Sequence, residues 1–424
     1  MFNSSRIQVN LNSVLHTLFC WYALSVSFEL ILEQLFDIDT ILKPFRILSL
    51  SIIGVYVIQS VKHGIRFYSS ERKDILLYSI FVYGLLISCV QVALTVFNMG
   101  LFYNDLFLVG LHVLVFFVFK ATPISSEIRL KILHYFVTGV VLNACYILYN
   151  VFFKIQFGRQ AGFIDNPNYA ALGLVAAMAF FLIRSNYYLK FIHRLAIVMI
   201  LVLLIYIFVI TGSRAGLVIF LLVLFFLFLY ATFRRKLLII LISGVIVFQL
   251  VSLGGGYAYS GVSLVLINRI NQKSMNDQEE DVRFAIWDGV FRALEDRGYW
   301  GMGIGQFKAN FVKYFNEESN PLIVEIVNRR YYLSPHNDYL AILADYGWPS
   351  LMFYLIFLFL AVTAGFKKFI VHEKNATLHF LNRYNFVILL CLIVFGLAAE
   401  NFQHQLFWFL LMVSTKSLTN PNTI

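Results

Sequence analysis

Three arginines and one histidine lie in polar stretches that separate the long apolar segments of this sequence: Arg159, Arg214, Arg283 and His336. The planar guanidinium group of arginine binds phosphate or pyrophosphate oxygens in bidentate fashion, without a metal ion. A neutral imidazole accepts a proton from a hydroxyl group as a general base, an effect worth about 10²–10⁴ in rate. If the four side chains converge, they suit attack by a hydroxyl on a carbon that carries a pyrophosphate leaving group, because the developing charge of that group needs neutralising.

His336 follows Ser334 and Pro335 at the start of an apolar span. Serine is favoured at the N-cap of a helix and proline at its first position, so we expect a helix to begin here with His336 in its first turn. The positive end of a helix disfavours a second positive charge, which should keep the imidazole neutral near pH 7. The alternative interpretation is a histidine that is merely solvated beside a helix end.

Arg214, in Thr-Gly-Ser-Arg-Ala-Gly, lies at the tip of an expected hairpin between two apolar spans. A cation is disfavoured at a helix N-terminus and on the outer membrane face, so we expect an anionic partner. The alternative is an interfacial arginine that reaches the lipid headgroups. Arg159 precedes another span at the same face, and the stretch 165–168, which ends in Asn168, is typical of turns and helix caps.

Arg283 lies on an expected amphipathic helix that Gly298 ends. Arg283 and Trp287 share one face of this helix at i,i+4 spacing. A solvated charge on a helix face is the alternative to a binding role for Arg283. The apolar stripe of the helix consists of Val282, Ile286, Val290 and Leu294.

Two other motifs have weaker functional interpretations. Asp37 and Asp39 match the Asp-x-Asp pattern that binds metal in many glycosyltransferases, but so short a match in a short loop does not predict a metal site. Gly301, Gly303 and Gly305 follow no evident strand, so they lack the context of a dinucleotide-binding loop. We interpret these glycines as backbone that allows a tight fold.

The elements that must position these residues are membrane helices. Of the 424 residues, 60% are hydrophobic and 13% are charged, against about 25% charged in ordinary soluble domains. The apolar runs are continuous, not alternating, and reach the roughly 20 residues that a helix needs to cross a bilayer. We therefore expect an all-α, polytopic membrane protein with about twelve spans, near residues 14–34, 47–61, 75–97, 103–119, 130–153, 168–184, 192–211, 214–232, 236–253, 337–366, 384–399 and 403–416.

Basic residues set the expected orientation. With the N-terminus in the cytoplasm, five internal loops are all basic, and both chain termini are cytoplasmic. The predicted organisation is an N-terminal bundle over 1–253, one large outer helical subdomain over 254–336, and C-terminal spans over 337–424.

The net positive charge and the cysteines exclude other interpretations. The net charge of +10 lies in the short basic loops between spans, which argues against a nucleic-acid partner. All four cysteines lie within apolar spans, so we expect no disulfide in the outer subdomain. The first apolar run lacks an early cleavage site, so we expect it to remain as a span.

An ordered set of motifs resembles the O-antigen ligase/O-antigen polymerase family. The motifs lie between residues 158 and 365 and read Gly158-Arg159 with Asn166-Pro-Asn168, Thr211-Gly-Ser-Arg214, Arg283-x-x-x-Trp287, Gly301-x-Gly303-x-Gly305-x-Phe307, and Pro335-His336-Asn337-x-Tyr339-Leu340 with Gly347. The resemblance implies an inverting, metal-independent glycosyltransferase of the GT-C type that needs no cofactor. The resemblance further implies action at the periplasmic face of the bacterial inner membrane on a glycan linked to undecaprenyl pyrophosphate.

The resemblance also implies site residues. The arginines at Arg159, Arg214 and Arg283 would engage pyrophosphate, and His336 would position or deprotonate the acceptor. With them we assign Asn168, Trp287, Asn337 and Tyr339 to substrate binding.

Polymerases join repeat units on the lipid carrier, whereas ligases transfer the polymer onto lipid A–core. The aromatic composition favours an O-antigen polymerase. An O-antigen ligase is the first alternative. A lipid-linked sugar flippase is the second alternative, although the charges collect at the outer surface and not in mid-bilayer. A chain-length regulator and a flippase in the same membrane are further expected partners.

Overall fold

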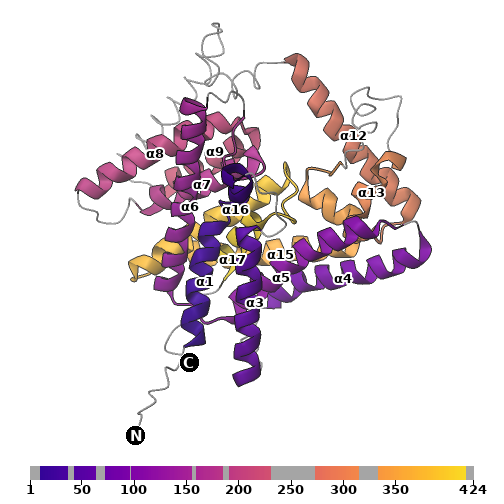
Figure 1. The fold of residues 1–424 in the computed structure, drawn as a ribbon, viewed down its shortest axis with the longest axis horizontal. Helices are drawn as coiled ribbons and strands as arrows, with labels where there is room; N and C mark the ends of the chain where they lie inside the picture. Colours follow the sequence, from indigo (N-terminus) through magenta and orange to yellow (C-terminus); the bar gives the residue numbers. More distant parts are fainter. Residues whose placement is uncertain are drawn as a thin grey trace.

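The computed structural model describes residues 10–36, 43–63, 72–95, 97–154, 159–184, 191–230, 273–314 and 333–416. These residues form helices and connecting turns without strands (Figure 1). The helices are α1 (Leu11–Ser25), α2 (Ile31–Phe36), α3 (Pro44–His63), α4 (Arg72–Leu94), α5 (Met99–Ala121), α6 (Ser126–Phe153), α7 (Pro167–Arg184), α8 (Phe191–Thr211), α9 (Arg214–Tyr230), α12 (Lys273–Arg297), α13 (Gln306–Tyr314), α15 (Asp338–Ile370), α16 (Ala376–Gly396) and α17 (Gln405–Thr415).

Eight of the described helices are long and apolar enough to cross a membrane: α3 to α8, α15 and α16. The shorter helices α9 and α17 are also apolar. The all-α, polytopic class predicted from the sequence is therefore confirmed. The expected span at 236–253 and the Asp37/Asp39 motif lie outside the described residues.

The core is formed by helices that approach one another closely. Helix α7 is rich in alanine and is buried along most of its length, because its small side chains let neighbouring backbones come near. A side chain at Gly216 of α9 would place its Cβ 2.7 Å from the Cβ of Ala171 in α7. Helices α16 and α17 lie in the middle of the molecule (Figure 1), and almost every residue of α17 is buried.

The expected first span at 14–34 is wrong as a continuous helix. Helix α1 ends at Ser25, and α2 begins only at Ile31. Within the break, the Leu30 amide donates to the Phe163 carbonyl at 2.7 Å. This hydrogen bond takes the amide out of the helical pattern. The polar segment Ser-Phe-Glu of residues 27–29 thus forms a turn that brings Glu29 into the interior.

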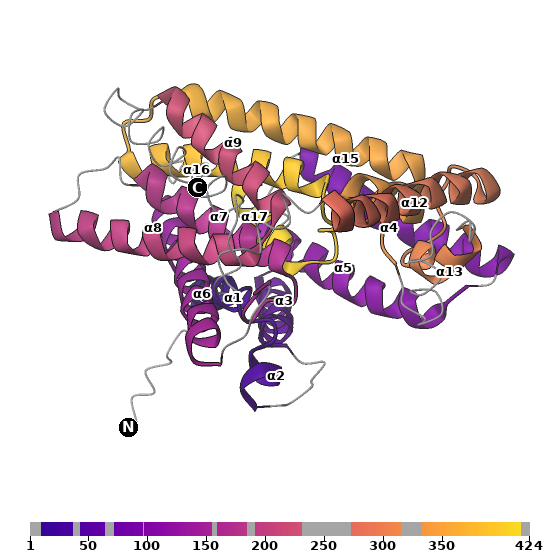
Figure 2. The ribbon, with the colours of Figure 1, turned by 90° about the horizontal axis from the view of Figure 1, so that it is seen from above.

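Helix α15, which runs along the length of the molecule in Figure 2, contains a kink at Gly347 (φ +76°). Pro349 follows shortly after and cannot donate a helical hydrogen bond. The carbonyl groups freed at the kink pair with the segment before α13. The amides of Met302 and Gly303 donate to the carbonyls of Ala344 and Asp345, both at 2.9 Å.

The three spaced glycines make this pairing possible. Gly301, Gly303 and Gly305 have φ values of +99°, +98° and +73°, which residues with a side chain rarely adopt. The tight fold expected for this motif is confirmed. The Asp345 carboxylate accepts from the amides of Gly305 (3.1 Å) and Phe307 (2.9 Å), and so caps the N-terminus of α13.

Candidate functional site

A cavity of about 270 Å³ lies where the starts of α3, α7, α15 and α17 meet. Its polar lining is unusual inside an otherwise apolar bundle and includes acidic, basic, imidazole and amide groups. These are Glu29, Asp165 and Glu400; Arg46 and Lys308; His336 and His404; and Asn166, Asn168, Gln403 and Gln405. Concave sites with convergent polar groups are where ligands bind.

His336 lines this cavity, but it is not in the first turn of a helix as we expected. The N-cap of α15 is Asn337, whose side chain accepts from the amides of Tyr339 (2.9 Å) and Leu340 (3.1 Å). The expected cap at Ser334 is therefore wrong, because the short amide side chain of Asn337 satisfies the helix N-terminus three residues later. His336 precedes this cap in a left-handed conformation (φ +49°).

The environment of His336 keeps its imidazole neutral. Burial lowers the pKa of His336 below its ordinary 6.5, and the charges of Arg283 and Lys308 act in the same direction. Glu400 opposes them. The lowered pKa agrees with the neutral imidazole that we expected. Its main cause is burial and not the helix terminus. A neutral imidazole that remains accessible from the cavity can accept a proton.

Asn168 joins Arg159 to the connection between α8 and α9. Its Oδ1 accepts from Arg159 Nη2 and from Ser213 Oγ, both at 2.9 Å. Arg159 Nε also donates to the Thr211 carbonyl at 3.1 Å. The cap expected in this stretch is present, since the Asn168 amide donates to Asn166 Oδ1 at 2.8 Å. One wall of the cavity thus holds Arg159 in a fixed position.

Arg214 is the first residue of α9, directly after this hydrogen-bonded cluster. Ser213 Oγ accepts from the Gly216 amide at 3.0 Å, so Ser213 caps α9 while it also donates to Asn168. The expected position of Arg214 at a helix N-terminus is confirmed. Segments near residues 159, 168 and 214 therefore meet through one amide side chain.

Helix α12 brings Arg283 toward His336. Ile286, Val290 and Leu294 are buried, as the apolar stripe predicted, whereas the side chain of Val282 lies outside the described part. Gly298 follows the last helical residue and has φ +81°. Trp287 Nε1 donates to the Pro335 carbonyl at 2.9 Å, which fastens α12 directly beside His336.

Asn337 and Tyr339 hold the start of α15 in place. Asn337 Nδ2 donates to the Leu397 carbonyl at 3.2 Å, and the Tyr339 hydroxyl donates to the Ile393 carbonyl at 2.9 Å. Asp338 accepts from Asn401 Nδ2 at 2.8 Å and from the Phe402 amide at 3.2 Å. These contacts fix the segment 398–405 beside His336. Substrate binding by Asn337 and Tyr339 stays a prediction.

A buried ion-pair network beside His336 escaped the sequence interpretation. Lys308 Nζ on α13 lies 3.1 Å from Glu400 Oε1 and 3.7 Å from Asp105 Oδ2, and it donates to Gln403 Oε1 at 2.7 Å. Burial acts to lower the pKa of Lys308, but the surrounding carboxylates Glu400, Asp105 and Asp345 raise it above the ordinary value. Lys308 therefore carries its positive charge into the cavity.

A protein-family model described as O-antigen ligase matches residues 199–355. The matched segment includes Arg214, Arg283, Trp287 and His336. This match supports the resemblance to the O-antigen ligase/polymerase family that the ordered motifs indicated. No curated protein matches the chain.

Proposed function

We propose that this protein is an O-antigen polymerase. It joins repeat units linked to undecaprenyl pyrophosphate by inverting glycosyl transfer that needs no metal ion. The observation that supports this most is the cavity itself. It places His336 in one lining with Asn168, which holds Arg159 and the Ser213–Arg214 turn, while Trp287 fastens the helix of Arg283 beside it.

In the proposed reaction His336 takes the proton of an acceptor sugar hydroxyl. The oxygen attacks the anomeric carbon of the donor from the face opposite the pyrophosphate. The carbon–oxygen bond to the pyrophosphate breaks as the new glycosidic bond forms, which inverts the anomeric configuration. Arg159, Arg214 and Arg283 neutralise the charge that develops on the leaving pyrophosphate. The proton on His336 then passes to solvent.

The expected topology is part of this proposal. The basic loops orient the chain with both termini in the cytoplasm, so the cavity faces the periplasm of the bacterial inner membrane. This is the compartment where lipid-linked repeat units are expected after transport across the membrane.

Purified protein in nanodiscs should extend lipid-linked repeat units, and His336→Ala and Arg283→Ala should reduce extension by about 10²–10⁴. The chain offers matched controls. Arg292 lies exposed on the same helix as Arg283, paired with Asp288 at the surface, and His372 is an exposed histidine far from the cavity. Arg292→Ala and His372→Ala should behave as wild type. Unchanged extension in both cavity variants would overturn the proposal. Turnover in nanodiscs, where no closed compartment exists, would also exclude pure transport.

Ligase activity is the alternative, favoured by the description of the matching family. A polysaccharide gel on a deletion strain distinguishes the two activities. Loss of a polymerase leaves lipid A–core carrying a single repeat unit, whereas loss of a ligase leaves the polymer on its lipid carrier.

A further inference from the structure

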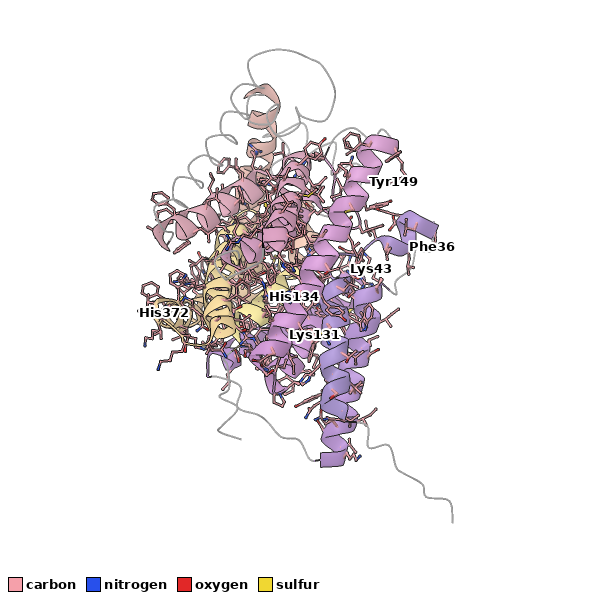
Figure 3. The ribbon with its side chains drawn as sticks, turned by 90° about the vertical axis from the view of Figure 1, so that its left-hand side faces the viewer. Phe36, Lys43, Lys131, His134, Tyr149 and His372 are labelled. Carbon is pink, nitrogen blue, oxygen red and sulfur yellow. The ribbon has the colours of Figure 1, made fainter. Side chains whose placement is uncertain are left out.

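The turn between α1 and α2 carries a carboxylate into the cavity at a place where the sequence predicts only a membrane span. Glu29 lines the cavity, and its side chain is 11% exposed. Arg46, in the first turn of α3, lines the same cavity. In Figure 3, Lys43 lies with α2 on the side of the molecule away from His372. The cavity therefore has a second group of charged residues, Glu29 and Arg46, which lie far in sequence from Arg159, Arg214 and Arg283.

Glu29 is held as an ionised group with acceptor capacity to spare. Its Oε1 accepts from Lys43 Nζ at 2.8 Å and its Oε2 from Gln405 Nε2 at 3.1 Å, while His404 Nε2 lies 3.6 Å from Oε2. Burial favours the protonated carboxyl, but His404 and Lys43 outweigh it and hold the pKa of Glu29 below its ordinary value. A carboxylate offers about four lone-pair positions, so with Lys43, Gln405 and His404 in place Glu29 has room for one further donor.

The segment 398–405 connects this end of the cavity with His336. Near one end of the segment Glu400 pairs with Lys308 and interacts electrostatically with His336. At the other end Gln405 and His404 face Glu29. Tyr169 links the two parts, because its hydroxyl donates to the Glu400 carbonyl and its ring stacks on the His404 ring. A ligand bound at Glu29 would therefore share one continuous cavity with the proposed base.

Glu29, Arg46 and Gln405 take no part in the proposed transfer step. Lys308 and His336 lie within the matched segment 199–355, whereas Glu29, Arg46 and Gln405 lie outside it, as does Asn168. A charged end of the cavity that the transfer step does not use suits recognition of the sugar.

We propose that Glu29, Arg46 and Gln405 form the binding subsite for the acceptor sugar. This proposal rests on the proposed glycosyl transfer. A sugar presents neighbouring hydroxyl groups that both donate and accept hydrogen bonds. One such hydroxyl donates to the remaining lone pair of Glu29, and the guanidinium of Arg46 donates to a second hydroxyl or to the ring oxygen. The sugar is thereby oriented with another hydroxyl toward His336.

The test measures saccharide binding separately from transfer. The probe is the free repeat-unit oligosaccharide, released by mild acid from the lipid-linked repeat unit of a host that lacks this protein. It carries no lipid and no pyrophosphate, so it reports on sugar recognition alone. Its Kd is measured calorimetrically with the full chain in nanodiscs for wild type, Glu29→Gln, Arg46→Gln and Glu33→Gln. Glu33 is an exposed carboxylate on α2 that does not line the cavity, so it provides a matched control.

Glu29→Gln and Arg46→Gln should each weaken binding by about tenfold or more, because each removes a charged hydrogen-bonding partner. Glu33→Gln should bind as wild type. Wild-type affinity in both folded cavity variants would overturn the subsite. If Glu29→Gln fails to fold without its Lys43 pair, Arg46→Gln decides the question. Extension of lipid-linked repeat units is assayed on the same preparations. Binding that depends on Glu29 without any extension by wild type would retain the subsite and reject the proposed reaction.

Discussion

Replacing Asn168 with aspartate should separate the stability of the site from its activity. Asn168 Oδ1 accepts from Arg159 and Ser213, both at 2.9 Å, and an aspartate oxygen can accept both. A hydrogen bond to a charged group contributes about 1.5–3 kcal/mol, against about 0.5–1.5 kcal/mol for a neutral one. Asn168→Asp should therefore keep the free energy of unfolding unchanged or raise it by about 1 kcal/mol. Asn168→Ala leaves the buried Ser213 hydroxyl and the half-buried Arg159 guanidinium without this acceptor and should lower the free energy of unfolding by about 1–3 kcal/mol.

The effect of Asn168→Asp on activity should have the opposite sign. The new carboxylate neutralises Arg159 and stands in the cavity wall where the proposal places a pyrophosphate. Two like charges 4 Å apart repel by about 1 kcal/mol in water and by about 4 kcal/mol near a protein surface. This range corresponds to a loss of donor affinity of about 5- to 1,000-fold.

The assay combines thermal unfolding with the KM for lipid-linked repeat units, measured on the same nanodisc preparations. Asn375→Asp is the control, because Asn375 is an exposed N-cap of α16 that accepts from the Leu378 amide at 3.1 Å. Aspartate serves equally well as an N-cap, so this variant should match wild type in both measurements. A wild-type donor KM for a folded Asn168→Asp variant would refute the placement of the pyrophosphate beside Arg159.

Three further predictions concern the base, the glycine pairing and the α12 contact. Transfer should be lost as pH falls through the lowered pKa of His336, so its acid limb should lie below pH 6.5. Glu400→Gln removes the charge that raises this pKa and should move the limb to still lower pH, and a limb that stays in place would contradict the assigned interaction. Gly301→Ala forces φ +99° on a residue whose Cβ would lie 2.7 Å from the Gly347 amide nitrogen. It should lower the free energy of unfolding by about 1–3 kcal/mol or more in a denaturation series. Trp287→Phe removes the donor to the carbonyl of residue 335. It should lower the free energy of unfolding by about 0.5–1.5 kcal/mol and reduce kcat while leaving KM nearly unchanged. A change in KM alone would argue against a positioning role.

The fold class was predictable because continuous apolar runs allow little other than membrane helices. The break after Ser25 was not predictable, since it depends on a hydrogen bond from Leu30 to Phe163 on a distant segment. The first residue of helix α15 could not be predicted from the sequence either. Ser334 and Asn337 are both good N-caps, and the choice between them depends on tertiary contacts such as the bond from Asn337 to the Leu397 carbonyl.

The site was predictable in part. Arg214 and Arg283 stood out because they are polar residues at expected helix positions with a clear chemical use. Lys308 and Glu400 did not stand out, because each resembles an ordinary surface charge in sequence, and Glu29 was included in the expected first span. Their role depends on burial beside partners from other helices, such as Lys308 with Glu400 at 3.1 Å. Two signals could have directed attention to these residues: the position of Glu400 between the expected spans 384–399 and 403–416, and the presence of the carboxylate Glu29 within the expected span 14–34.

The kink at Gly347 joins the outer helical subdomain, predicted over 254–336, to helix α15. The carbonyls of Ala344 and Asp345 find their amide partners in residues 302 and 303, and Asp345 also caps α13. Excising residues 302 and 303 would leave the carbonyls of the buried residues Ala344 and Asp345 without donors, which costs free energy. The outer helical subdomain is therefore part of the folded helix bundle and not a separately folding unit above it. Any tilting of α15 during a catalytic cycle would carry Lys308, and with it the charge balance around His336, in the same movement.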